Sequence, residues 1–137
     1  AAVWALGLLR GAASREPLSN ALSGDSNPWV RGQAAIALGQ LGRDAVDDLT
    51  AALWAEKEDQ VRSAILWSLG GIADARASSM LLSCAGDASL PAVTRAAGAA
   101  AIGRAFRHRE PCFPKLRFQH NNLLIPDITA WAFAQEM

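Results

Sequence analysis

Four short segments of this chain resemble one another and recur at a nearly constant spacing. Each closes with leucine or isoleucine followed by glycine, and the closing glycines stand at positions 7, 39, 70 and 103, which are 32, 31 and 33 residues apart. A second apolar stretch follows, so each period contains two helix-length stretches. Such a period is typical of solenoids that stack helix pairs. The sequence therefore predicts an all-α solenoid of antiparallel helix pairs, and the aligned segments are Ala2–Gly7, Ala34–Gly39, Ile65–Gly70 and Gly98–Gly103.

The residue types within a unit support this prediction. Val46, Leu49 and Leu53 follow one another at i, i+3 and i+7, which places them on one stripe of an amphipathic helix. Alanines dominate the segments before the closing glycines, so neighbouring helices can approach closely. The glycines themselves are expected to end or interrupt those helices, as a left-handed residue would. Acidic residues stand just before or at the start of the next helices, where they favour the positive end of the helix dipole; they are Asp25, Asp59 and Asp87.

One unit shows the repeat in its complete form. The run from Val30 to Gly42 has the pattern Val-Arg-x-x-Ala-Ala-x-Ala-Leu-Gly-x-x-Gly. This pattern resembles the short bacterial HEAT-like repeats that also occur in phycobilin lyases and in deoxyhypusine hydroxylase. The resemblance covers about residues 1–106, with an incomplete first unit, and it is specific for fold rather than function because the shared positions are packing positions. Residues 107–137 are predicted to be a capping segment of the same domain, with a closing helix near residues 127–135.

The first unit begins in the middle of its helix. Four apolar side chains of that helix would then face nothing on the upstream side, and apolar surface of this extent is normally covered. We expect either further repeats upstream in a longer solenoid or a homodimer through this face. The four residues are Ala2, Val3, Leu6 and Leu9.

Composition narrows the class of partner. Thirteen basic and thirteen acidic residues give a formal net charge of zero, whereas nucleic acids and anionic membranes favour a basic excess. Hydrophobic residues make up 51% of the chain, which excludes a disordered protein. Neither a membrane span nor a signal peptide is visible, so a cytoplasmic location is expected. A protein or peptide partner is therefore favoured over nucleic acid or a membrane.

One position per repeat defines a candidate binding groove. The resemblance implies that the Arg-bearing helices line the inner, concave surface of the solenoid. A residue at the same place in successive repeats lies in a row along that surface. Exposed tryptophan in such a row favours a binding site, and the alternative is that neighbouring helices or the cap cover these side chains. The candidate groove residues are Trp4, Trp29, Gln33, Ile36, Gln40, Ser63 and Trp67.

Basic residues also recur, and they allow two interpretations. Arg31, Arg62 and Arg95 appear once per repeat and could clamp an acidic ligand. The favoured interpretation is that each bonds to helix-end carbonyls or to the loop acids of an adjacent turn. A basic cluster over residues 104–117 could contact phosphate or an acidic partner, although a solvated surface of the cap is favoured.

No metal or catalytic motif of the sequence is convincing. Deoxyhypusine hydroxylase places His-Glu pairs directly after the Val-Arg pair, and the three corresponding pairs in this chain cannot bind iron. A set of His108, Cys112 and His120 has soft ligands but matches no standard zinc spacing. No nucleophile has an identifiable base. We therefore expect neither an enzyme nor a cofactor. The pairs that stand in place of the His-Glu pairs are Gly32-Gln33, Ser63-Ala64 and Ala96-Ala97.

These observations favour a scaffold or interaction module that holds a protein or peptide in the concave groove. The alternative, from the enzyme class, is a phycobilin-lyase-like or other enzyme-accessory subunit, which would need an apolar pocket with an acid or base at its rim.

Overall fold

The computed structural model describes residues 12–108, and all regular structure in that part of the chain is helical. This confirms the predicted all-α class. Six α-helices and two short 3-10 helices follow one another in the described range. They are η1 (Ala12–Ser14), α2 (Arg15–Gly24), α3 (Pro28–Leu41), η2 (Gly42–Ala45), α4 (Val46–Ala55), α5 (Asp59–Gly70), α6 (Ala75–Gly86) and α7 (Ala92–His108).

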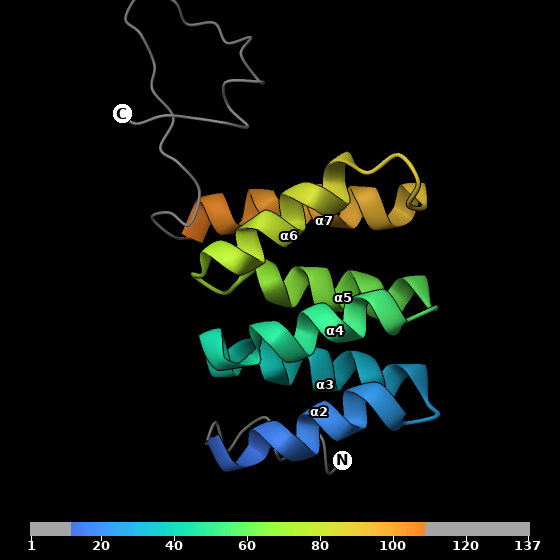
Figure 1. Cartoon of the computed structure of the whole chain (residues 1–137), viewed down its shortest axis with the longest axis vertical. Coiled ribbons are helices and arrows are strands. Elements are labelled where there is room, and N and C mark those ends of the chain that lie inside the picture. The colour runs from blue at the N-terminus through green and yellow to red at the C-terminus, as the bar shows by residue number, and fades with distance from the viewer. Residues whose placement is uncertain (1–11, 109–137) are drawn as a thin grey trace, which may run out of the picture.

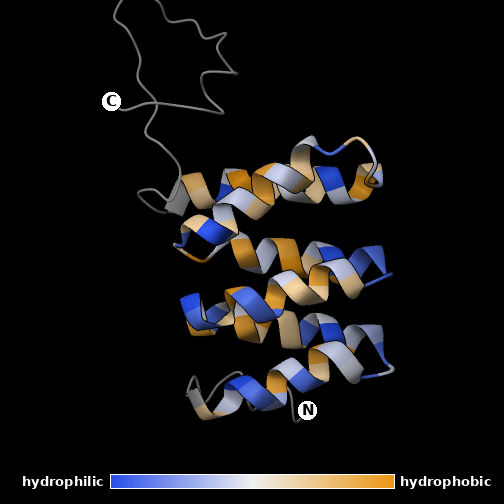
Figure 2. Ribbon diagram, in the orientation of Figure 1, coloured by the Kyte–Doolittle hydropathy of each residue, from blue (hydrophilic) through white to orange (hydrophobic). Residues whose placement is uncertain are grey.

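The helices form two layers that run the length of the stack. Helices α2, α4 and α6 lie in front in Figure 1, and α3, α5 and α7 lie behind them. We call the first set the outer layer and the second the inner layer. Each helix mixes hydrophobic and hydrophilic residues along its length (Figure 2), as amphipathic helices do. The hydrophobic residues meet between the layers, and the largest fully buried ones include Leu18, Leu38, Leu49, Ile65, Leu66, Leu69 and Leu81.

Local sequence explains where the helices begin and end. The side chain of Asn27 accepts a hydrogen bond from the Trp29 backbone N–H at 2.9 Å, and Pro28 occupies the first turn of α3. Asp74 caps α6 in the same way by accepting from the Arg76 N–H at 2.8 Å. Helix α3 ends at Leu41, and its C-cap is Gly42, whose φ of 85° lies in the region that favours glycine.

Glycines bring the inner-layer helices into close contact. A Cβ placed on Gly39 of α3 would lie 2.8 Å from the Cβ of Ser68 on α5. One repeat later, a Cβ on Gly70 would lie 2.6 Å from the backbone oxygen of Ala101 on α7. Both distances are too short for real atoms, so only glycine allows the backbones to approach this closely. The expected close approach of small-faced helices is confirmed.

The expected left-handed role of these glycines is wrong. Gly39 and Gly103 lie inside α3 and α7, Gly70 is the last residue of α5, and within residues 12–108 only Gly42 has a positive φ. The physical reason for glycine at the repeating position is therefore the missing Cβ and not its conformational freedom. Gly7 lies outside the described residues.

Ion pairs join successive helices of the outer layer. On α4, Asp48 accepts from Arg15 of α2 at 2.7 Å, and the adjacent Asp47 accepts from Arg76 of α6 at 2.9 Å. Neighbouring residues on a helix point in different directions, so one short acidic pair contacts the repeat on each side. These pairs are partly exposed, and we regard them as aligning the helices more than stabilising them.

Several predictions about the two ends lie outside the described residues. These are the uncovered apolar residues at the start of the chain, Trp4 of the candidate groove, and the closing helix near residues 127–135. Helix α7 continues to His108, two residues past the expected end of the repeats at position 106. The rest of the predicted capping segment, residues 109–137, is not described.

Replacing Gly70 with alanine tests the close packing of the inner layer. The added Cβ meets the backbone of α7, which cannot move aside without shifting a helix, so the free energy of unfolding should fall by about 1–3 kcal/mol. Gly86→Ala is the matched control, since Gly86 also ends its helix but a Cβ added there would have nothing within 4 Å. Denaturant unfolding measures both variants, and equal stabilities would contradict this account.

A second prediction concerns a threonine at a packing position. Thr94 occupies the place of Val61 in the preceding repeat and is as deeply buried, but its hydroxyl has no hydrogen-bond partner among the described residues. A buried unpaired hydroxyl is costly, so Thr94→Val should raise the free energy of unfolding by about 1 kcal/mol. Thr50→Val, at a half-buried threonine of α4, serves as the control and should gain less. A destabilised Thr94→Val protein would refute the assignment.

Candidate functional site

Large apolar side chains are exposed on the face of the inner layer that is turned away from the outer layer. Trp67 of α5 is 44% exposed and Ile36 of α3 is 38% exposed. They stand 31 residues apart, at the same place in successive repeats, as the sequence predicted. A second row near the start of the helices contains Trp29 of α3 and Val93 of α7, which are 62% and 54% exposed. The inner layer therefore carries apolar residues at both ends of its exposed face.

Ile36 and Trp67 line one groove. The groove encloses about 610 Å³, within the range of known ligand sites. Its walls come from the last turns of α3 and α5, the turn that follows α5, two residues of η2 and one residue of α7. We call it the Trp67 groove, and its lining residues are Ile36, Gly39, Gln40, Gly42, Arg43, Trp67, Ser68, Gly71, Ile72, Ala73 and Arg104.

A cation lies against the tryptophan. The Arg104 guanidinium sits 4.4 Å from the centre of the Trp67 ring, which is the geometry of a cation–π contact. The same guanidinium donates a hydrogen bond from Nη1 to the Trp67 backbone oxygen. Arg104 corresponds to Gly71 of the preceding repeat. The guanidinium of Arg104 lies close to Gly71 itself, and a Cβ on Gly71 would lie 3.0 Å from the guanidinium nitrogens, so the glycine leaves room for it. Trp67 and Arg104 thus form one fixed aromatic and cationic surface.

A second arginine enters from the turn after α3. Arg43 lines the Trp67 groove, and its Nε donates to the backbone oxygen of Ala73 at 3.0 Å. Ala73 belongs to the equivalent turn of the next repeat, so this bond ties the two turns together. Among the described residues that line the groove, two are cationic and none is acidic.

The remaining candidate residues divide between the two ends of the face. Gln40 lines the Trp67 groove with Ile36 and Trp67. Gln33 and Ser63 are half-buried nearer the start of their helices, and the Ser63 hydroxyl donates to the Asp59 backbone oxygen at 2.9 Å. Trp29 lies in the first turn of α3 and does not line the groove.

Sequence reasoning missed the two arginines of the groove. It places Arg104 only within a basic cluster on the cap surface, and it assigns no role to Arg43. The alignment contains the necessary signal, because Arg104 follows Gly103 directly, as Gln40 follows Gly39, a position assigned to the groove.

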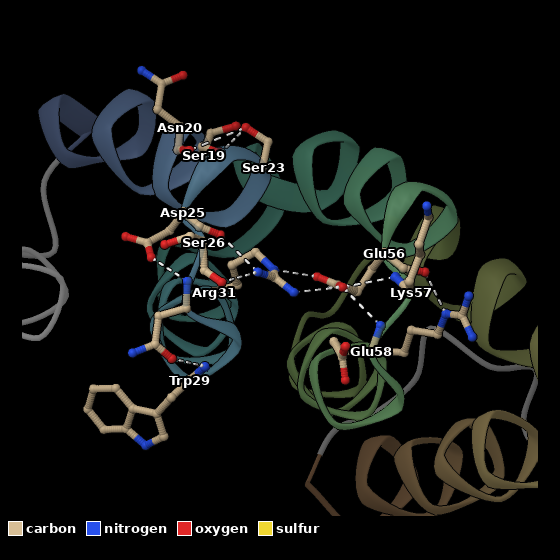
Figure 3. A network of polar contacts seen from close by, with 12 residues as sticks. Ser19, Asn20, Ser23, Asp25, Ser26, Trp29, Arg31, Glu56, Lys57 and Glu58 are labelled. Carbon is tan, nitrogen blue, oxygen red and sulfur yellow. Dashed lines mark hydrogen bonds and ion pairs between the residues drawn. The ribbon is translucent and has the colours of Figure 1, made fainter.

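The repeating arginines have a structural role at the opposite end of the helices. Arg31 forms two hydrogen bonds with the Glu56 carboxylate, from Nε at 2.8 Å and from Nη2 at 3.1 Å (Figure 3). Its Nη1 donates to the Asp25 backbone oxygen at 2.8 Å. Arg62 of the next repeat donates to the backbone oxygen of the same Glu56, also at 2.8 Å. The Trp29 ring points away from this network (Figure 3), which leaves it on the exposed face.

The predicted bonds to loop carbonyls are therefore confirmed for Arg31 and Arg62. The predicted acidic partner is found for Arg62, which pairs with Asp59, but not for Arg31, which pairs with Glu56. The sequence alignment grouped Asp59 with the other loop acids, whereas the structurally equivalent acids are Asp25, Glu56 and Asp87, spaced by 31 residues. Each accepts the backbone N–H of the residue two positions later, at 2.8–3.0 Å. Arg62 also pairs with Asp59 at 3.3 Å. The third arginine, Arg95, has a buried Nε without a hydrogen-bond partner among the described residues.

Glu56 is ionised in this network. Burial alone would raise the pKa of its carboxyl, but the hydrogen bonds from Arg31 and from the Lys57 and Glu58 backbone N–H groups outweigh that effect and lower the pKa below its ordinary value. The side chain is 8% exposed and that of Arg31 is 16% exposed, so solvent screens this pair less than the other ion pairs of the described residues.

A second hollow lies between α2 and α4 and encloses about 530 Å³. Its charged lining residues include Arg31, Glu56 and Asp48, which already pair with partners in the protein. We therefore interpret this hollow as part of the junction between repeats and not as a candidate binding site.

The described residues contain neither a cluster of metal ligands nor an exposed thiol. In the part of the chain that the structure describes, no three His, Cys, Asp or Glu side chains gather closely enough to hold a metal ion. Cys84 is fully buried in the core, and burial raises the pKa of its thiol. Cys112 and His120 lie outside the described residues. Within residues 12–108, no helix combines the length and apolarity needed to cross a membrane.

Comparison with known families agrees with the repeat. The family model described as HEAT repeats matches this chain twice, over residues 1–70 and over residues 16–103. The two matches overlap and together span well over half of the chain. A comparison with curated proteins finds no match.

The lowered pKa of Glu56 predicts an acid-sensitive contribution to stability. A group whose pKa is depressed by folding stabilises the protein above its ordinary pKa, here 4.5, and loses that contribution as the pH falls through the lowered value. Glu56→Gln should therefore lower the Tm at neutral pH, and the gap from wild type should narrow as the pH falls below 4.5.

Thermal melts over a pH series measure this gap. Glu16→Gln, which removes an exposed carboxylate from the first turn of α2, is the control and should show a small gap. A gap for Glu56→Gln that stays constant into the acidic range would show that the charge of this carboxylate contributes nothing.

Proposed function

This chain belongs to the HEAT repeat family, and we propose that it is a binding module that holds a segment of a protein or a peptide on the exposed face of α3, α5 and α7. The observation that carries the proposal is the exposed pair of Ile36 and Trp67 in one groove. HEAT repeats are commonly protein-interaction scaffolds, which agrees with a binding role.

Packing supports the choice of this face as the inner one. Helices of the inner layer contact one another extensively, whereas those of the outer layer contact one another little. The glycine contacts at Gly39 and Gly70 shorten the distances within the inner layer. A stack whose one layer is more closely packed curves toward that layer, so we place the Trp67 groove on the concave side of the solenoid.

Exposure distinguishes the groove residues from the core. The core of the described residues consists of leucines, isoleucines, valines, alanines and Cys84, and no tryptophan belongs to it. Trp67 instead keeps almost half of its surface open to solvent. Aromatic side chains in partly open grooves are frequent anchors of protein interfaces. Removing this ring should therefore affect binding more than folding.

We propose binding rather than catalysis. The groove provides apolar surface, an aromatic ring, two cations and amide groups, which recognise a partner without chemical change. Ile36, Gln40 and Trp67 are the residues that we assign to recognition from the sequence and the geometry together. A net charge of zero favours a protein or peptide over nucleic acid or a membrane surface.

A comparison of two tryptophans tests the proposed face. A random peptide display library is selected on the immobilised chain, and the enriched peptides are synthesised with a fluorescent label. Trp67→Ala should weaken their binding by about 2 kcal/mol or more, which is roughly 30-fold, with little change in Tm. Trp54→Ala is the matched control, because Trp54 is 54% exposed but lies on α4 in the outer layer.

Fluorescence anisotropy gives the affinities and circular dichroism gives the Tm. Loss of binding in Trp54→Ala alone would move the site to the outer layer. A large fall in Tm for Trp67→Ala, with the affinity preserved, would make Trp67 a packing residue and remove the basis of the proposal.

A further inference from the structure

We infer that the segment bound in the Trp67 groove is acidic, with a carboxylate next to an apolar side chain. This inference rests on the proposed function and adds the chemistry of the partner. It depends on the position of two arginines that the proposed function itself does not require. The groove brings these arginines, from α7 and from the turn after α3, to the same apolar surface.

The charged side chains among the described lining residues of the Trp67 groove are all cationic. Arg43 and Arg104 line it, and its lining contains no acidic residue within the described range. Asp74 lies close enough to Arg43 for their charges to interact, but its carboxylate is bound by Arg76, through Nε at 3.1 Å and Nη2 at 3.1 Å. Asp74 also accepts the Arg76 backbone N–H. The carboxylate of Asp74 is thus committed to the cap of its own helix.

The arginine on α7 is held in place before any partner arrives. Its cation–π contact with Trp67 and its bond to the Trp67 backbone oxygen fix the plane of the guanidinium. A guanidinium carries five N–H donors in a fixed fork that suits a carboxylate. Preorganised donors lose less conformational entropy on binding than mobile ones. A partner carboxylate that bonds to Arg104 would place the neighbouring side chain over the Trp67 ring and Ile36.

A protein segment fits this surface better than a nucleic acid. Arginine and tryptophan together also suit stacked bases, but binding a strand without sequence preference uses several aromatic rings and a row of cations. The groove holds one tryptophan and two arginines beside the aliphatic Ile36 and Ile72. The chain as a whole has no basic excess. We therefore commit to an acidic peptide segment and treat nucleic acid as an outcome of the test.

The peptides selected on the chain provide the first readout. Their sequences should be enriched in aspartate or glutamate next to leucine, isoleucine or an aromatic residue, relative to the unselected library. Matched peptides with asparagine or glutamine at each acidic position should bind about tenfold more weakly, and added salt should weaken the acidic peptides most.

Variants of the chain provide the second readout. Arg43→Gln and Arg104→Gln should each weaken the acidic peptides by about tenfold and should leave the amide-substituted peptides unchanged. Arg104→Lys keeps the charge and should recover part of the affinity. Arg15→Gln is the matched control, because it removes a cation from the outer layer, where Arg15 pairs with Asp48. Should Arg104→Gln fail to fold, Arg43→Gln and the peptide substitutions decide the question.

The outcomes separate the two proposals. Peptides that depend on Trp67 but not on Arg43, Arg104 or their own acidic residues would overturn the acidic partner and leave the binding face intact. Peptides that do not depend on Trp67, or a library that yields no binders, would overturn both. Tight binding of a labelled oligothymidylate, competed by none of the peptides, would replace the acidic segment with a single-stranded nucleic acid.

Discussion

The close approach of α3, α5 and α7 is the contact on which the rest of this structure depends. Gly39 faces Ser68, and Gly70 faces Ala101, at distances that leave no room for a Cβ. Because the same contact recurs in successive repeats, the rotation between repeats stays similar and equivalent residues fall into rows. The row that contains Ile36 and Trp67 is a direct consequence. A groove with defined walls exists because the helices that bear it cannot separate without losing this packing.

Arginines have different roles at the two ends of the inner-layer helices. At their beginnings, Arg31 and Arg62 both bind Glu56, one through its carboxylate and the other through its backbone oxygen, so polar groups of the loops are satisfied within the protein. At their ends, Arg43 and Arg104 also bind backbone oxygens, but they do so inside a groove with exposed apolar walls. Arginine therefore links neighbouring repeats at one end of these helices and gives the groove its positive charge at the other.

Much of the fold could be predicted because the same pattern of packing residues recurs in each repeat. The stripe of Val46, Leu49 and Leu53 is buried as its spacing indicated, and the alanine-rich helices form the close layer. The role of the repeating glycines was predicted wrongly, since a glycine near a helix end has two explanations that look alike in sequence. Only the position of the neighbouring helix distinguishes a missing Cβ from a positive φ, as Gly70 and Gly42 illustrate.

The sequence by itself determined the period, the two helices per unit, and the alignment of Ile36 with Trp67, because these follow from local periodicity and from repetition. Only the tertiary structure decided that Arg31 binds Glu56 and that Arg104 lies over Trp67. These pairs are 25 and 37 residues apart, so they follow neither the spacing within a helix nor the period of the repeat. Which side chains meet across two repeats depends on how far one helix is displaced and rotated against the next, and that geometry is set by packing between helices and not by the pattern within them.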